Sequence, residues 1–186
     1  EKMLRYRPAD FYEKNGVTTL LGRRAAKVDA AAKTVVLEDG AAVPYDKLCL
    51  CTGSRPFVPP MEGLDAVENK TSFMTLDDAK RLDALLGAGN DRRVLIVGAG
   101  LIGLKCAEGI QQRVSELTVI DLAPRILPNV LTEAPAAIIQ KYLEGKGVRF
   151  LLGDSVARFE PHTAYLKSGG TSSWPPIRAA RSNEGS

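Results

Sequence analysis

The chain has 186 residues, of which 45% are hydrophobic and 25% charged, and its formal net charge is +3. These values are ordinary for a soluble globular protein and give room for one domain or a domain and a half. The small net charge argues against nucleic-acid binding, and the sequence also has no basic stripe with interleaved aromatics. The apolar runs are too short to span a bilayer, and the charged start EKMLRYR is no signal peptide. We therefore expect a cytoplasmic protein without membrane contact.

The first 51 residues predict a short helix and a small β-meander. A helical piece over 9–14 is ended by Asn15-Gly16, a good helix-stop pair. Apolar, β-branched runs separated by turn residues then predict strands. The expected strands are Val17–Leu21, Ala25–Asp29, Thr34–Leu37, Ala41–Pro44 and Lys47–Cys51.

The cysteines and the single histidine, His162, limit the metal and disulfide chemistry. Cys49 and Cys51 alternate along the last of these strands and face one side, which is a poor geometry for a disulfide. There is no C-x-x-C motif, and one histidine excludes a multi-histidine site within one chain. We expect Cys49, Cys51 and Cys106 to be reduced and buried, and we expect no metal.

A crossover and a helix follow the meander. Pro56, Pro59 and Pro60 forbid regular structure, so the stretch after Cys51 is interpreted as a connection between domains. Thr75 and Asp78 then form a T-x-x-D capping box for a helix from Leu76 to about Leu86. The glycine-rich residues 87–90 end this helix.

The strongest signal lies in Val94–Asp121, VLIVGAGLIGLKCAEGIQQRVSELTVID. Val94–Val97 is a continuous apolar run, typical of a central parallel strand buried on both faces. A G-x-G-x-x-G turn, a helix to about Arg113 and a second strand over Leu117–Ile120 come next. Asp121 ends that strand, which completes the dinucleotide-binding βαβ fingerprint in its expected context.

Each part of this fingerprint has a physical task. Gly98 allows a sharp turn, Gly100 lets the backbone approach a pyrophosphate, and Gly103 lets the helix pack close to the strand. The helix N-terminus offers free N–H groups to phosphates. Asp121 accepts hydrogen bonds from both ribose hydroxyls and repels a 2′-phosphate, which favours NAD over NADP. The alternative is a similar turn that binds another nucleoside or none; Asp121 argues against it. The predicted cofactor-binding residues here are Gly98, Ala99, Gly100, Leu101, Ile102, Gly103 and Asp121.

The remaining chain continues the alternating pattern and then changes character. Thr132 is expected to cap a helix to about Lys146, with Pro135 in its first turn. Val148–Leu152 is the next parallel strand, and a hairpin over Val156–Glu160 and Thr163–Lys167 comes after it. From Gly169 onwards the sequence is rich in Gly, Ser, Pro and Arg, which predicts disorder with Trp174 exposed.

Four stretches make the chain similar to the pyridine-nucleotide FAD/NAD(P)-dependent oxidoreductases, in particular the rubredoxin- and nitrite-reductase-like branch. Phe11–Asp29 resembles the segment that meets the FAD adenine, and PYDKLCLCTGSRPFVPPMEGLD resembles the strand with the A-T-G-x-x-P motif. The fingerprint resembles the NADH half, and TVIDLAPRILP with YLEGKGVRFLLGDSV resembles the family's next segments along the chain. The resemblance covers about residues 1–168.

The resemblance implies an α/β fold in which a Rossmann-like NADH-binding domain, 75–168, is inserted in a partial FAD-binding domain, 1–74, before a tail at 169–186. It implies FAD and NAD(H) as cofactors, with hydride passing from NADH to flavin and electrons then passing to a carrier protein or small acceptor. The cofactors carry that chemistry, so we name no catalytic residue. By resemblance, Arg125 approaches the adenosine ribose; the alternative is a solvated surface arginine. The residues expected near FAD are Ala25, Cys51, Thr52, Gly53 and Arg55, although Thr52-Gly53 also fits an ordinary strand-ending turn.

The departures from the family pattern leave alternatives open. No FAD fingerprint precedes Glu1, the sequence after Lys167 does not continue as the expected strand, and Lys105 stands where relatives often have Glu. We therefore expect a fragment with an aberrant end. The alternatives are a non-catalytic NAD-binding fragment that cannot retain FAD and a coenzyme A-disulfide-type reductase. The expected partners are NADH, a small electron carrier such as rubredoxin and a second copy of the chain, with exposed apolar surface favouring self-association.

Overall fold

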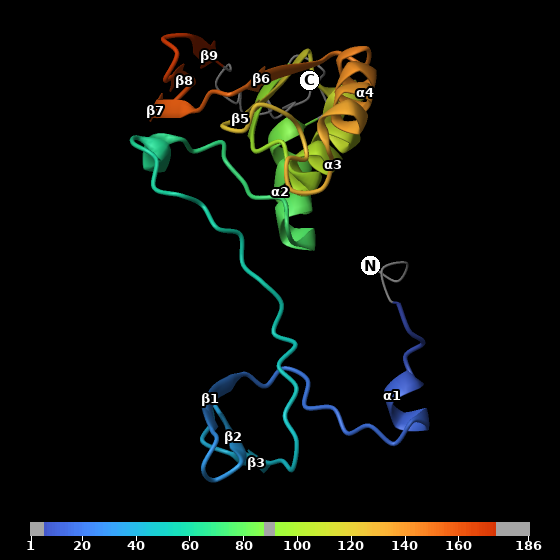
Figure 1. Cartoon of the computed structure of the whole chain (residues 1–186). Helices are drawn as coiled ribbons and strands as arrows, with labels where there is room; N and C mark the ends of the chain where they lie inside the picture. The colour runs from blue at the N-terminus through green and yellow to red at the C-terminus, as the bar shows by residue number, and fades with distance from the viewer. Residues whose placement is uncertain (1–5, 88–91, 174–186) are drawn as a thin grey trace, which may run out of the picture. The chain divides into compact units, whose positions relative to one another are not determined.

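The computed structural model describes residues 6–87 and 92–173 and divides the chain into two compact units, Glu1–Gly53 and Ser54–Ser186 (Figure 1). The predictions for Trp174 and for the rest of the tail after Ser173 lie outside the described residues. Throughout the described ranges, no helix is long and apolar enough to cross a membrane.

The first unit is a short helix followed by a three-stranded antiparallel meander. α1 (Phe11–Lys14) precedes β1 (Ala25–Asp29), β2 (Thr34–Leu37) and β3 (Ala42–Pro44), which pair in the order β1-β2-β3. The second turn uses Gly40 at φ 85°, a left-handed conformation that glycine adopts without steric cost. The meander predicted from the sequence is therefore confirmed.

Two predicted strands of this unit do not form. Neither Val17–Leu21 nor Lys47–Cys51 is a strand, and both segments are largely exposed. An apolar, β-branched run becomes a strand only when a neighbouring strand satisfies its backbone groups, and no described strand pairs with either segment. The expectation of buried cysteines fails for the same reason, because Cys49 and Cys51 are exposed while Cys106 is buried.

The second unit is built on a parallel sheet with helices on one face. After η2 (Leu64–Ala66) and α2 (Leu76–Leu86), the chain runs through β4 (Arg93–Val97), α3 (Leu101–Ile110), η3 (Gln111–Arg113), β5 (Glu116–Asp121), α4 (Glu133–Glu144) and β6 (Val148–Leu152). The strand order is β4-β5-β6, so β5 is central and β4 lies at an edge of this sheet. The sequence predicted a central strand over Val94–Val97, whereas among the described strands β4 has a partner on one side only. Strand order depends on long-range pairing that an apolar run does not reveal.

Alternation along the central strand separates two clusters of buried residues. Leu117 and Val119 of β5 pack with the helices, together with Leu104 and Ala107 of α3. Ile120 points to the other face. There it meets the antiparallel sheet of β7 (Val156–Glu160), β8 (Thr163–Leu166) and β9 (Thr171–Ser173), through Val156, Phe159, Ala164 and Leu166. The parallel sheet is thus covered on both faces within the second unit.

Strand β9 corrects the expectation of disorder for residues 171–173. Thr163, Ala164 and Tyr165 of β8 pair with Ser173, Ser172 and Thr171, in that order. Backbone hydrogen bonds carry this pairing, which is why a polar, glycine-rich stretch without apolar periodicity still forms a strand.

Helix α2 begins as the sequence predicts. The Thr75 hydroxyl accepts a hydrogen bond from the Asp78 N–H at 3.1 Å, and the Asp78 carboxylate accepts one from the Thr75 N–H at 3.0 Å. Hydrogen bonds from the Met74 and Thr75 N–H groups lower the pKa of Asp78. The capping box therefore satisfies backbone donors that the first turn leaves free.

Candidate functional site

The loop between β4 and α3 begins with a sharp turn at Gly98. Its φ is 117°, a conformation that residues with a side chain rarely adopt. Its N–H group donates a 2.8 Å hydrogen bond to the Ile120 carbonyl of the neighbouring strand β5. The turn is therefore tied to the carboxyl end of the sheet.

Gly103 and Gly100 differ in the space around them, as their predicted tasks require. A Cβ atom at Gly103 would collide with the carbonyl oxygen of Gly98, so only glycine lets α3 pack this close to the turn. A Cβ atom at Gly100 would meet nothing within 4 Å. The close helix–strand packing predicted for Gly103 is confirmed, and open space lies beside the Gly100 backbone.

Helix α3 starts beside this open space. Gly100 is its N-cap residue and has no side chain to bond the first N–H groups. Leu101 and Ile102, in the first turn, are 62% and 48% exposed. Free N–H groups and the positive end of the helix dipole suit a phosphate group.

Asp121 ends β5 and holds the loop in place with both carboxylate oxygens. Oδ2 accepts a 2.6 Å hydrogen bond from the Ala99 N–H group, and Oδ1 accepts a 2.8 Å hydrogen bond from the Ala123 N–H group. Each oxygen keeps a further lone pair. The half-buried carboxylate therefore fixes the fingerprint loop and can still accept from a ligand hydroxyl.

The loop after β5 supports the fingerprint in a way that the sequence did not predict. The Leu127 N–H group donates to the Ala99 carbonyl at 2.9 Å, and Leu127 has a φ of 49°. A left-handed leucine is uncommon, and no Gly or Asn marks the position in the sequence. With Asp121 on its N–H group and Leu127 on its carbonyl, the fully buried Ala99 has both backbone groups bonded.

Arg125 braces this same loop. Its Nε donates to the Leu131 carbonyl at 3.3 Å and an Nη donates to the Pro128 carbonyl at 3.1 Å. The guanidinium is half-buried and hydrogen-bonded within the loop, so the alternative of a freely solvated surface arginine is wrong. A contact with the adenosine ribose stays a prediction.

The structure brings together Gly98–Gly103, Asp121 and the loop of Arg125 within the second unit. The residues expected near FAD in the first unit are all exposed: Ala25, at the start of β1, and Cys51, Thr52 and Gly53, in an irregular segment. Gly53 has a φ of 72°, and the exposed Arg55 comes two residues later. Among the described residues, no hydrogen bond joins these five to one another.

Lys105 occupies the exposed side of α3, two residues after Gly103. Its ammonium group forms a 2.5 Å ion pair with Glu108 one turn further along the helix. Its neighbour Cys106 is buried, and burial raises the pKa of its thiol to about 11. A buried thiol with a raised pKa is a poor nucleophile near neutral pH.

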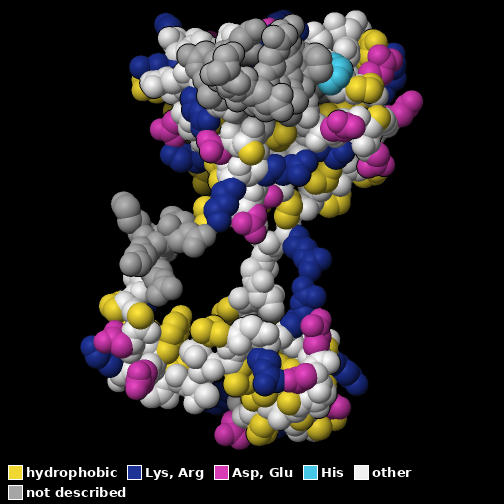
Figure 2. Space-filling model, turned by 180° about the vertical axis from the view of Figure 1, so that it is seen from behind, with side chains coloured by type: hydrophobic (Ala, Val, Ile, Leu, Met, Phe, Trp, Pro, Cys, Tyr) yellow, Lys and Arg dark blue, Asp and Glu magenta, His cyan; other side chains and the backbone are white. Residues whose placement is uncertain are grey.

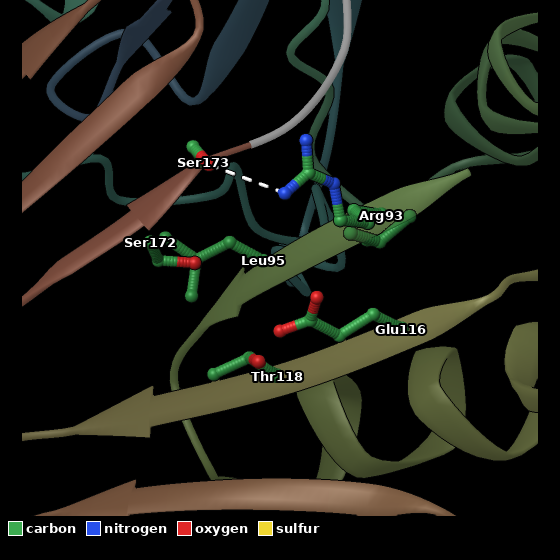
Figure 3. Close-up of a pocket in the computed structure, with 7 residues that line it drawn as sticks. Arg93, Leu95, Glu116, Thr118, Ser172 and Ser173 are labelled. Atoms are coloured by element: carbon green, nitrogen blue, oxygen red, sulfur yellow. Dashed lines mark hydrogen bonds between the residues drawn. The ribbon is translucent and has the colours of Figure 1, made fainter. Parts of the chain in front are cut away.

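A small pocket at the other end of the parallel sheet does not match a cofactor site. It is lined by Arg93 and Glu116, the first residues of β4 and β5, and by Ser172 and Ser173 of β9, with the Arg93 guanidinium donating to Ser173 Oγ at 3.3 Å (Figure 3). It encloses no space that a water molecule could occupy, so it cannot hold a ligand of ordinary size. In the part of the chain that the structure describes, no group of His, Cys, Asp or Glu residues is arranged to hold a metal ion.

The sequence from residue 5 to residue 178 matches the family described as pyridine nucleotide-disulphide oxidoreductase. This match covers most of the chain, and the chain belongs to that family. The sequence is similar to an NADH oxidase of Methanocaldococcus jannaschii, with 31% identity over 156 residues, which are 82% of this chain and 35% of the relative. It is 30% identical to a rubredoxin-NAD(+) reductase of Pseudomonas putida over 169 residues, 89% of this chain and 42% of that one.

The fold matches solved structures of the same family. The structure of a putidaredoxin reductase in covalent complex with putidaredoxin is similar, with a TM-score of 0.82 and 26% identity over 92% of this chain and 43% of that one. These matches confirm the α/β fold and the family predicted from the sequence. The chain spans less than half the length of the relatives that it matches.

Proposed function

We propose that the second unit binds NADH at the carboxyl ends of β4 and β5. The observation that carries this proposal is a contrast between two glycines. A Cβ atom at Gly103 would collide with the backbone of the turn, whereas the space beside Gly100 is open. The first brings the start of α3 against the turn, and the second leaves the backbone free for a pyrophosphate, whose charge suits the uncapped helix N-terminus. Ala99, Leu101 and Ile102 supply the remaining backbone around that position.

The same geometry favours NADH over NADPH. Asp121 keeps a free lone pair on each oxygen for the ribose hydroxyls, while its negative charge opposes a 2′-phosphate at the same place. Arg125 is the nearest cation along the loop, but its guanidinium is already bonded to the Pro128 and Leu131 carbonyls. We expect NADH to bind at least about tenfold more tightly than NADPH.

For the whole protein, we propose an NADH-dependent flavoprotein oxidoreductase that passes hydride to flavin and electrons onward to a carrier protein or small acceptor. The family and the similarity to the rubredoxin and putidaredoxin reductases support this proposal. Flavin would accept the hydride, and the part of this chain is to bind and orient the nicotinamide cofactor. Ala25, Cys51, Thr52, Gly53 and Arg55 are the proposed contacts to FAD, with the electron carrier and a homodimer as further proposed partners.

A second candidate is an NAD-binding module that does not retain flavin. The observation that favours it is the exposure of Cys51, Thr52 and Gly53, which form no cradle among the described residues. A visible spectrum of the desalted protein, recorded before and after anaerobic addition of NADH, separates the two candidates. A yellow protein that NADH bleaches supports the flavoprotein, whereas a colourless protein that still binds NADH supports the module.

The test of NADH binding uses two matched glycines. Gly100→Asp places a carboxylate at the proposed pyrophosphate position, and Asp is a favoured N-cap residue that leaves α3 intact. Gly109→Asp makes the same change near the end of α3, where a Cβ also meets nothing within 4 Å. In a titration followed by NADH fluorescence, we expect Gly100→Asp to weaken binding at least about tenfold and Gly109→Asp to bind as the unchanged protein does. Equal affinities would contradict the proposed site.

A further inference from the structure

Ala99 lies between two glycines of the fingerprint loop, and two different elements hold its backbone. Its N–H group donates to Asp121 Oδ2 at 2.6 Å, and its carbonyl accepts from the Leu127 N–H group at 2.9 Å. The flanking Gly98 and Gly100 have no side chains that would restrict rotation of the peptide units on either side. The orientation of these peptide units therefore depends on the groups to which they are hydrogen-bonded.

The partner of the Ala99 carbonyl also sets the direction of the Gly100 N–H group. Both groups belong to one planar, trans peptide unit, in which the C=O and N–H bonds point in opposite directions. Because the carbonyl points to Leu127, the Gly100 N–H group points away from it. Gly100 is exposed, and among the described residues its N–H group donates no backbone hydrogen bond. If this peptide unit turned over, it would present a carbonyl oxygen in place of the N–H group, and a carbonyl oxygen repels a phosphate.

Leu127 aims its N–H group from within a hydrogen-bonded turn, residues 125–131. Its φ of 49° lies in the left-handed region, where few residues with a side chain are found. Its carbonyl accepts from the Val130 and Leu131 N–H groups, at 2.9 Å each, and its side chain is buried. These contacts hold the left-handed conformation that directs the N–H group to Ala99.

Arg125 closes the same turn with its side chain. Its guanidinium donates to the Pro128 carbonyl at 3.1 Å and to the Leu131 carbonyl at 3.3 Å. The start of the turn is thereby tied to its end, on either side of Leu127. Without these two hydrogen bonds, the left-handed conformation would depend on the backbone bonds and on packing alone.

We propose that Leu127 is a positioning residue for NADH and that Arg125 acts through it. Leu127 fixes the Ala99–Gly100 peptide unit so that its N–H group faces the pyrophosphate, and Arg125 keeps Leu127 in the conformation that this requires. Neither side chain touches the cofactor in this role. The inference rests on the proposed NADH site, and it adds to that site two residues outside the G-x-G-x-x-G motif.

The first test replaces Leu127 with residues of opposite backbone preference. Leu127→Gly adopts the left-handed conformation without steric cost but loses the whole buried side chain, whereas Leu127→Val keeps most of the side chain and disfavours that conformation. In an NADH fluorescence titration of the full chain, we expect Leu127→Val to weaken binding at least about fivefold and Leu127→Gly to stay within about twofold of the unchanged protein. A role in packing alone predicts the reverse order, because Leu127→Gly leaves the larger cavity.

The second test observes the Gly100 amide directly in the ligand-free protein. In protein isotopically labelled at its glycine nitrogens, the Gly100 resonance is the one that Gly100→Asp removes. Arg125→Met keeps an apolar side chain and loses the two hydrogen bonds, so we expect it to shift this resonance and to weaken NADH binding at least about threefold. The control Arg113→Met removes an arginine that pairs with Asp83, away from the loop, and should change neither readout.

Two results would overturn the proposal while NADH binding itself stands. Leu127→Val could bind NADH as tightly as Leu127→Gly or more tightly, which would mean that the backbone conformation of this residue does not matter. Arg125→Met could weaken NADH binding while the ligand-free Gly100 resonance stays in place, which would mean that Arg125 acts on the cofactor directly. Failure of the proposed function is distinguishable from both, because the unchanged protein would then not bind NADH.

Discussion

The two units of this chain contain the same kinds of elements but differ in what their side chains bury. In the described part of the first unit, Leu37 is the single buried hydrophobic residue, at 9% exposure. The second unit has two clusters of buried residues, one on each face of its parallel sheet. Figure 2 shows hydrophobic side chains on the surface of the first unit, beside charged ones. Regular hydrogen bonding is thus present in both units, but apolar burial that can stabilise a unit is concentrated in the second.

This difference matters for function because the proposed NADH site lies in the unit with the buried core, whereas most of the proposed FAD contacts lie in the unit without one. The fingerprint loop lies in the second unit, where Ala99 of the loop itself and Val119 and Ile120 of β5 are fully buried. The residues assigned to FAD by resemblance lie mainly on exposed, irregular backbone of the first unit. We therefore expect NADH binding to be a property of the second unit by itself.

The largest expected effect comes from filling the space between helix and turn. Gly103→Val adds a Cβ that collides with the Gly98 carbonyl, so we expect a loss of roughly 3 kcal/mol or unfolding of the second unit. Gly109→Ala, in the same helix with open space around its Cβ, should stabilise it by about 0.5–1 kcal/mol. Urea unfolding followed by circular dichroism measures both changes. A Gly103→Val variant as stable as the unchanged protein would show that the close packing is not required.

A smaller effect compares the same truncation in the two units. Val119→Ala removes two methyl groups from a fully buried position of β5 and should cost about 2–3 kcal/mol. Val28→Ala acts on a β1 side chain that is 39% exposed and should cost less than about 1 kcal/mol. The measurement is the urea midpoint of each variant. Equal costs would remove the distinction between a unit with a core and one without.

Alkaline pH should weaken the second unit through Cys106. Burial raises its thiol pKa from 9.0 to about 11, so between these values the folded state keeps a proton that the unfolded state has lost. Stability therefore falls as pH rises from about 9 to about 11, by at most about 2.7 kcal/mol. Other groups titrate in this range, so the readout is the difference in pH slope between the unchanged protein and Cys106→Ala. Parallel slopes would show that burial of the thiol does not affect its titration.

The smallest effect compares the starts of two helices. Thr75→Ala removes the side-chain cap of α2 and should cost about 1 kcal/mol, whereas Thr75→Ser should keep most of the stability. Asp10, at the start of α1, makes no side-chain cap hydrogen bond, and its ion pair with Lys14 is exposed. Asp10→Ala should change stability by less than about 0.5 kcal/mol. Thermal unfolding of the three variants measures these shifts, and a cost for Asp10→Ala equal to that of Thr75→Ala would contradict the comparison.

The features that the sequence predicted are those set by local chemistry. The capping box at Thr75, the glycine turn at Gly98 and the helix that follows Gly100 each depend on residues close together in the chain, and all three were found. The features that were missed depend on distant partners. The edge position of β4 and the pairing of β9 with β8 depend on strand order, and the exposure of Cys49 results from the lack of a paired neighbour in the described structure.

In the candidate site, too, the sequence predicted the features set by local spacing and missed those that depend on how the loop folds. The spacing of the glycines and of Asp121 predicted which residues form the loop. In the structure, Gly103 packs against Gly98, and Asp121 accepts a hydrogen bond from the Ala99 N–H group. The support of the loop by Leu127 could not be predicted, because a left-handed leucine has no sequence signature. The bonding of Arg125 to the Pro128 and Leu131 carbonyls was hidden for a similar reason, since it depends on how the loop closes on itself.

The central claim is that NADH binds to the fingerprint loop of the second unit, and hydrogen exchange with and without NADH tests it most directly. The account predicts that NADH slows exchange of backbone amides in 98–103 and 121–127, while amides of β1, β2 and β3 in the first unit exchange as they do without it. NADPH at the same concentration should have a weaker effect, because Asp121 opposes its extra phosphate. Unchanged exchange in 98–103, or protection confined to the first unit, would contradict the account.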